Sequence, residues 1–211
     1  MTLKKVKPSL NRIAKSLAET QDAREFLLKN TREIIIISSR SIISAHKGDM
    51  KSAKNYLKQA DILLKKYKKK ITSDLQKYMI TPEQEYVEAA SLIAIMEKKE
   101  IPSEKELGVM SESYVLGLLD CIGELKRMIF DEIRIGDIDN ATRIFEVMEN
   151  LYLYLYPFSM YDKVVKEARR KIDVDRILID DVRGAITEEK RRSDLITALN
   201  KLQKYNLHKI K

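Results

Sequence analysis

Apolar residues recur with the spacing of an amphipathic helix along almost the whole chain. Only six Gly and four Pro are present, so few positions can break a helix. Short runs that alternate apolar and polar residues, as half-buried strands do, are nearly absent. The pattern predicts an all-α fold of seven helices, whose mostly short connections make successive helices pack antiparallel.

Capping and terminating residues divide this pattern into segments. Gly48 and Gly184 are expected to end helices, since glycine readily adopts the positive φ found after a helix C-terminus. Side chains that can cap a helix N-terminus belong to Asp49, Thr81, Asp137, Ser159 and Thr187. The helices expected from these signals cover residues 9–46, 49–79, 81–99, 111–136, 137–156, 159–184 and 187–206.

Length and composition predict a single folded domain over residues 1–211. No shift in composition, internal repeat or low-complexity tract marks a boundary within the chain. Hydrophobic residues make up 44% and charged residues 34%, a mixture typical of folded soluble proteins. The ends, at about residues 1–7 and 207–211, are expected to fray.

The net charge of +8 and the pI of about 9.3 indicate a polyanionic partner such as RNA, DNA or an anionic membrane. A lysine-rich surface that only keeps the protein soluble is the alternative explanation. The lone Cys121 excludes an internal disulfide and favours a reducing, cytoplasmic location. The longest aliphatic run, residues 34–37, is too short to cross a bilayer, so no membrane partner is expected.

Most acidic residues have a basic residue one helical turn away, as Asp61 has Lys65 and Glu167 has Lys171. Four acids with no such partner, or only one, are Glu85, Glu88, Asp120 and Glu124. The first three have no Lys or Arg three or four positions away, and Glu124 has only Arg127. Within each of the two pairs, the acids lie about one turn apart and share a helix face.

The sequence around these four acids is strongly apolar, and a carboxylate on a buried face is costly unless a positive charge compensates it. An Arg from another helix could supply that charge, or a hard cation such as Mg²⁺ or Mn²⁺ could do so. Gly117 and Gly123 flank Asp120 and indicate a close approach to the helix backbone there, by a neighbouring helix or by nucleic acid.

Three blocks of sequence resemble the translin family and, within it, the Trax (translin-associated factor X) branch. They are TREIIIISSRSIISAHK at residues 31–47, QEYVEAAS at 84–91, and YVLGLLDCIGELKRM at 114–128 followed by GDID at 136–139. The second is similar to the Trax pattern Q-E-x-x-E-A-x-S, and the third to Y-L-L-G-x-x-D-x-x-G-E-L-x-R-M. A weaker similarity is VDRILIDDVRG at residues 174–184.

This resemblance implies a seven-helix bundle of the translin type that assembles into a hollow octamer around single-stranded or short duplex RNA. In Trax an acidic cluster binds Mg²⁺ or Mn²⁺ and supports endoribonuclease activity, whereas translin lacks that set and only binds. By motif position, the Trax acids correspond to Glu85, Glu88, Asp120 and Glu124. The resemblance therefore implies that these four residues are metal ligands and carry the catalysis.

Phosphate contacts are expected from Arg40, His46, Lys47 and Arg127, whose charges would replace the counterions of RNA. A plain solvated helix face is the alternative for Arg40 and Lys47, and a packed or capping histidine the alternative for His46. The first block departs from the family at Ser39, where a base is usual, and Lys47 replaces an arginine. The long loop that some Trax proteins carry between the third and fourth helices is short here. A lone, compact chain that resembles Trax implies a homo-oligomer, as in archaeal members.

Two other functions remain open. A non-catalytic binder of single-stranded RNA or DNA, as translin is, would keep its affinity without the four acids. A structural protein would use the same acids for salt bridges. A serine or cysteine catalytic triad is not indicated, and the lack of a glycine-rich phosphate loop argues against a nucleotide cofactor.

Overall fold

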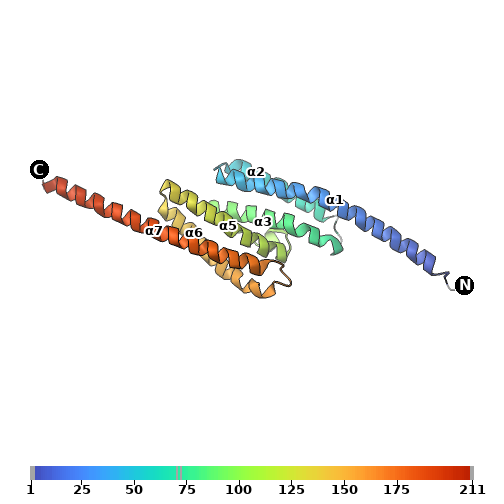
Figure 1. Cartoon of the computed structure of the whole chain (residues 1–211). Helices are drawn as coiled ribbons and strands as arrows, with labels where there is room; N and C mark the ends of the chain where they lie inside the picture. Colours follow the sequence, from blue (N-terminus) through green and yellow to red (C-terminus); the bar gives the residue numbers. More distant parts are fainter. Residues whose placement is uncertain (1–2, 70, 72, 210–211) are drawn as a thin grey trace. The chain divides into compact units, whose positions relative to one another are not determined.

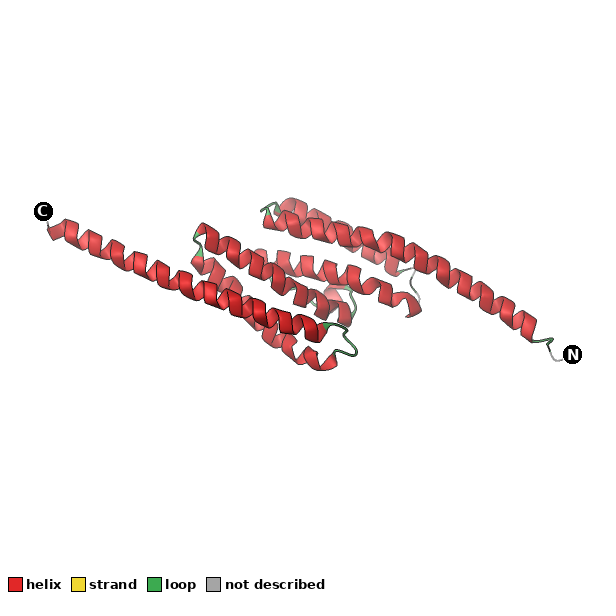
Figure 2. Cartoon of the chain, viewed as in Figure 1, coloured by secondary structure: helices red, strands yellow, loops and turns green. Residues whose placement is uncertain are grey.

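The structure is a computed structural model that describes residues 3–69, 71 and 73–209. Within these residues every regular element is a helix, as Figure 2 shows, and the all-α prediction is confirmed. The chain divides into two compact units, Met1–Gly117 (unit 1) and Leu118–Lys211 (unit 2), and their boundary falls inside one helix. The prediction of a single domain stays a prediction.

Unit 1 is built on three long helices that pack against one another: α1 (Val6–His46), α2 (Met50–Lys68) and α3 (Ile80–Met96) (Figure 1). A 3-10 helix, η1 (Ser73–Met79), precedes α3 and packs on α1 and α3. A short helix, α4 (Glu104–Leu107), leads into α5 (Ser111–Ile135). The buried core is formed by Leu27, Ile34, Ile37, Ala60, Leu64, Tyr67, Leu75, Met79 and Tyr86.

Unit 2 contains the rest of α5 together with α6 (Ile138–Leu155), the 3-10 helix η2 (Tyr156–Tyr161) and α7 (Ala168–Lys209). Helix α7 packs on α6 and η2. The largest buried side chains, which face inward from α5, α6 and α7, are Leu119, Ile122, Leu125, Ile129, Ile144, Met148 and Ile172.

Gly117 marks the place where the start of α5 meets α3. A Cβ atom there would lie 2.5 Å from the backbone oxygen of Gln84 and 2.6 Å from Cβ of Val87, so only glycine allows this approach. Of the two partners considered for Gly117, a neighbouring helix is therefore confirmed. At Gly123 a Cβ would meet no described atom within 4 Å, and no helix crowds that backbone.

Several expected helix boundaries are confirmed. Gly48 and Gly136 follow α1 and α5 with φ of +78° and +83°. Asp49 and Asp137 cap α2 and α6, accepting hydrogen bonds from the backbone N–H of Ser52 (3.0 Å) and of Asn140 (2.9 Å).

Other boundaries differ from expectation in the first half of the chain. Helix α1 begins at Val6 instead of residue 9, without a side-chain cap. The second expected helix ends early, at Lys68, and its last part is η1. Because η1 runs directly into α3, Thr81 lies inside the helix and does not cap it.

The two helices expected near the C-terminus are wrong: one continuous helix, α7, runs through Gly184, and Ser159 lies in η2. The Thr187 hydroxyl donates to the Arg183 carbonyl (2.7 Å), the bond of a residue inside a helix and not of a cap. A single helical glycine costs only about 1 kcal/mol relative to alanine, too little to end a helix that packs along its neighbours. Helical structure also reaches into both ends expected to fray, although residues 1–2 and 210–211 lie outside the described part.

No helix within the described residues is both long enough and apolar enough to cross a membrane.

Replacing Asp137 by Ala is expected to lower the free energy of unfolding by about 1 kcal/mol, since the Asn140 N–H loses its acceptor at the start of α6. Asp137→Asn keeps a side-chain oxygen in place and is expected to retain most of that stability. Urea denaturation of both variants measures the difference. Equal loss in Asp137→Asn and Asp137→Ala would show that the cap is not what stabilises this end.

Candidate functional site

The acids of the second sequence block lie on α3. Glu85 and Glu88 are one turn apart and half-buried, on a helix whose other faces carry fully buried residues such as Val87 and Leu92. A helix that is apolar on nearly all sides is held firmly by packing, so these two carboxylates have a rigid support.

Glu83, which the sequence did not single out, is the most buried acid of unit 1. Its side chain is 0% exposed, forms an ion pair with Lys68 (2.6 Å) and accepts a hydrogen bond from the Met110 backbone N–H (2.8 Å). The ammonium of Lys68 also donates to the Gly108 carbonyl. With both oxygens engaged by α2 and by the segment after α4, Glu83 ties these segments to α3 and has a structural role.

The acids of the third block lie on α5. Asp120 forms an ion pair with Lys171 of α7, and Glu124 lies 3.8 Å from Arg127, the local partner that its sequence offered. An inter-helical cation at Asp120 was one of the two expected sources of charge, although the structure supplies a lysine and not an arginine. Glu167, which has bases one turn away in the sequence, pairs with Arg170 (2.7 Å), while Lys171 pairs with Asp120.

Asp175, one turn after Lys171 on α7, is a functional candidate that the sequence analysis missed. It is only 4% exposed, and its Oδ2 atom is buried without a hydrogen-bond partner. Burial, and to a lesser extent the negative charge of Asp120, raise the pKa of Asp175 to about 7, while Lys171 opposes this shift. The similarity of residues 174–184 to the family was the available signal, but Lys171 one turn away made Asp175 look like an ordinary paired acid.

Asp120, Lys171 and Asp175 line the same pocket of about 220 Å³ in unit 2, between α5 and the first turns of α7. Asp120 and Gly123 contribute from α5, and Lys171 and Asp175 from α7. The open space beside Gly123 therefore belongs to this pocket. Arg170 also lines the pocket but is paired with Glu167 (2.7 Å), so the two carboxylates have only Lys171 as a pairing cation inside it. Carboxylates that outnumber their pairing cation can attract a further one.

The predicted metal ligands occur as two pairs, Glu85 with Glu88 on α3 and Asp120 with Glu124 on α5. Among the residues that the structure describes, no three or more His, Cys, Asp or Glu side chains gather where they could hold a metal ion.

The predicted phosphate-contact residues lie on two helices. Arg40 is exposed on α1 near the exposed Ile43, Lys47 is exposed directly after the helix, and His46 is half-buried in its last turn. Arg127 is exposed on α5. Exposed bases of this kind are available to contact a phosphate backbone.

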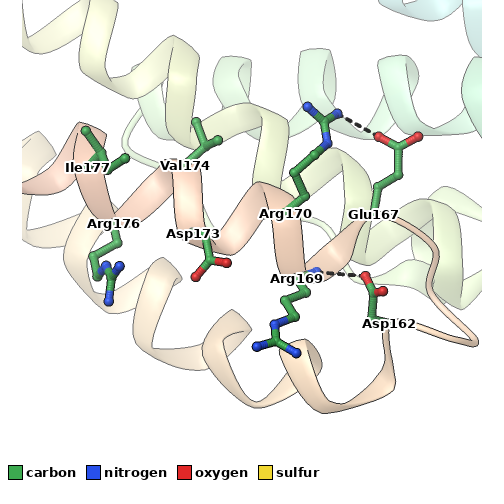
Figure 3. Close-up of a pocket in the computed structure, with 8 residues that line it drawn as sticks. All are labelled: Asp162, Glu167, Arg169, Arg170, Asp173, Val174, Arg176 and Ile177. Atoms are coloured by element: carbon green, nitrogen blue, oxygen red, sulfur yellow. Dashed lines mark hydrogen bonds and ion pairs between the residues drawn. The ribbon is translucent and has the colours of Figure 1, made fainter.

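A second pocket in unit 2, of about 710 Å³, is lined by three arginines and three acids that the sequence analysis did not notice (Figure 3). Arg169, Arg170 and Arg176 line it from the start of α7. Arg170 is paired with Glu167, and the backbone N–H of Arg169 donates to Asp162 (3.1 Å). Asp162, Glu167 and Asp173 line the same pocket, so its three guanidinium groups are balanced by three carboxylates.

The sequence model of the translin family matches residues 2–179. The chain belongs to the translin family. An uncharacterised protein of Methanocaldococcus jannaschii is 36% identical over 197 residues, which are 92% of this chain and 84% of the relative.

Solved structures of C3PO proteins are similar to this chain. AfC3PO superposes with a TM-score of 0.79 at 33% identity, covering 87% of this chain and 98% of that one. AfC3PO in complex with duplex RNA superposes with a TM-score of 0.78 at 31% identity, covering 87% and 97% of the two chains. NeC3PO without ligand gives a TM-score of 0.76 at 26% identity, covering 86% and 97%.

Proposed function

We propose that this chain is a Trax-like member of the translin family that binds RNA and cleaves it as a divalent-metal-dependent endoribonuclease. The Trax-like blocks at residues 84–91 and 114–128 support the branch. The similarity to AfC3PO, whose structure is known in complex with duplex RNA, supports RNA as the ligand. Single-stranded or short duplex RNA is the proposed substrate, read with low sequence specificity.

The observation that carries the catalytic part is the pocket that Asp120 and Asp175 line together. Oδ2 of Asp175 is buried there without a hydrogen-bond partner. Carboxylate oxygens are the ligands that Mg²⁺ and Mn²⁺ prefer, so these two side chains are donors of the kind that such an ion binds. The residues proposed to hold it are Glu85, Glu88, Asp120 and Glu124.

When bound, Mg²⁺ or Mn²⁺ would polarise the scissile phosphate and lower the pKa of a bound water. The chain's own residues would bind and orient the strand. Arg40 on α1, Lys47 directly after α1 and Arg127 on α5 are proposed to contact phosphates. Phosphate contacts position a strand without reading its bases, so cleavage should depend little on sequence.

The experiment is a cleavage assay of end-labelled single-stranded and duplex RNA with Mg²⁺, with Mn²⁺, or with EDTA. Fragments that appear with either metal and disappear with EDTA are the expected result. RNA that is bound but stays intact in all three conditions would refute the nuclease proposal and leave the binding proposal standing.

A non-catalytic binder of single-stranded RNA or DNA is the second candidate. The Lys171–Asp120 ion pair favours it, because a carboxylate already neutralised by a lysine has less need of a metal. This function predicts an affinity for nucleic acid that is equal with and without divalent metal.

Self-assembly into a homo-oligomer, an octamer by the family resemblance, is proposed as the working form. The first part of α1 carries a stripe of exposed apolar residues, Leu10, Ile13 and Leu17. They are spaced three and four positions apart. Such spacing is typical of helices that pair along an apolar seam. Light scattering on the purified protein measures the mass, and a monomer at micromolar concentration would contradict this proposal.

The double variant Arg40→Ala, Lys47→Ala is expected to bind RNA more weakly and with a smaller dependence on salt. Removing one charged group that touches a phosphate should reduce the slope of log affinity against log salt by about one. The matched control is the double variant Lys51→Ala, Lys58→Ala, which removes two exposed lysines of α2 and is expected to bind as the wild type does. Fluorescence anisotropy at several salt concentrations measures both. A slope that falls equally in the control would mean that only net charge matters.

A further inference from the structure

Two carboxylates of unit 2 have one lysine between them. The Lys171 ammonium forms an ion pair with Asp120 across α5 and α7, and Asp175 lies one turn beyond Lys171 on α7. All three side chains line the same 220 Å³ pocket. The lysine is therefore already engaged, and it neutralises only one of the two acids.

Asp175 is the acid that remains uncompensated. It is 4% exposed, and its Oδ2 accepts no hydrogen bond from the described residues. A buried carboxylate oxygen without a donor is unfavourable, and a bound ion is one of the ways in which such an oxygen is satisfied. Because the side chain lines the pocket, a cation that enters the pocket can reach it.

We propose that Asp175 is a further carboxylate of the Asp120 metal site, and that the Lys171 ammonium holds this site until a divalent cation displaces it. This inference rests on the proposed function, because it adds residues to the site where the metal acts.

The charges support this order of events. Lysine brings one positive charge against the two carboxylates, and Mg²⁺ or Mn²⁺ brings two, so the metal neutralises the pocket where the lysine does not. Lysine has a flexible stem with four carbons and can swing its ammonium away. Arg170, next to Lys171, lines the same pocket, so the released ammonium would join a second cation at its edge, where an RNA phosphate can bind.

The test is the affinity of the full chain for Mn²⁺ alone, without RNA, followed by the electron paramagnetic resonance signal of the free ion. Asp175→Asn, which keeps the shape and removes the charge, is expected to weaken Mn²⁺ binding by about 10- to 100-fold. Lys171→Met removes the competing cation at similar length. It is expected to tighten binding by about tenfold, the low end of what a nearby opposite charge does to a carboxylate.

The matched controls come from the neighbouring ion pair between the same helices, Lys126 with Asp181. Lys126→Met and Asp181→Asn make the same two chemical changes outside the pocket, and both are expected to bind Mn²⁺ as the wild type does. A melting curve for each variant shows that it is folded.

Unchanged affinity in Asp175→Asn, or weaker binding in Lys171→Met, would overturn this inference. If Asp175→Asn does not fold, the direction of the change in Lys171→Met decides alone. The inference can fail while the wild type still cleaves RNA with metal, which leaves the proposed function intact. The reverse is also visible, since the expected Mn²⁺ affinities without any RNA cleavage would refute the nuclease and keep the metal site. A wild type that binds no Mn²⁺ refutes both.

Discussion

Asp120→Asn is expected to lower Mn²⁺-dependent RNA cleavage by at least about 100-fold, because even residues behind metal ligands contribute 10- to 100-fold to affinity or activity. The change keeps the side-chain volume and removes the charge that would attract the metal. RNA affinity should remain, since the proposed phosphate contacts at Arg40 and Lys47 are on α1, a different helix. Cleavage rates at saturating protein, together with affinity from anisotropy, separate the two effects.

The control for Asp120→Asn is Asp181→Asn, because each variant breaks one ion pair between α5 and α7. If loss of an inter-helical salt bridge were enough to disturb the enzyme, both variants would lose activity. Only Asp120→Asn is expected to do so. Cleavage by Asp120→Asn equal to that of the wild type would remove Asp120 from the proposed site and favour the salt-bridge explanation of this acid.

Local sequence signals predicted the ends of helices correctly where the end depends on the conformation of only a few residues. Gly48 ends α1 with a positive φ and Asp137 caps α6, and both features depend only on a few neighbouring residues. The same kind of signal was wrong at Gly184, where a glycine lies inside the 42-residue helix α7. Whether a glycine ends a helix depends on the packing on either side, which spacing along one chain does not reveal.

The site shows the same limit. Asp120 could be recognised because no base lies one turn from it in the sequence, and its partner Lys171 comes from 51 residues away. The search for acids without a base one helical turn away did not select Asp175, because Lys171 lies one turn before it. In the structure Lys171 pairs with Asp120 instead. Asp175 is therefore left with a buried Oδ2 atom that has no hydrogen-bond donor. Pairing across helices is a tertiary property, and local spacing cannot assign it.

Gly117→Ala is expected to lower the free energy of unfolding by about 2 kcal/mol or more, within the range for overpacking a tightly packed contact. The added methyl group would lie 2.5 Å from the backbone oxygen of Gln84 and 2.6 Å from Cβ of Val87. Neither atom is the end of a flexible side chain, so the contact is relieved only if α3 and the start of α5 move apart. Urea denaturation measures the change in stability.

Gly123→Ala is the matched control, because it makes the same change on the same helix where a Cβ meets no described atom within 4 Å. Alanine is the better helix former by about 1 kcal/mol, so this variant should be as stable as the wild type or more stable. Opposite signs for the two substitutions would separate the close approach of α3 from the intrinsic preference of the helix. If Gly117→Ala unfolds at the same urea concentration as Gly123→Ala, the contact between α3 and α5 is looser than the structure shows.

The Gly117→Ala substitution is also expected to affect RNA cleavage. The new methyl group would collide with Gln84 and Val87 of α3. Each of these residues is directly followed by a proposed metal ligand, Glu85 or Glu88. A rigid helix moves as a unit, and displacements of about 1 Å can cost about 100-fold in rate. Gly117→Ala is therefore expected to cleave RNA more slowly than the wild type at temperatures where both are fully folded, while its RNA affinity is unchanged. Full activity in a folded but destabilised Gly117→Ala would show that α3 does not carry the metal ligands.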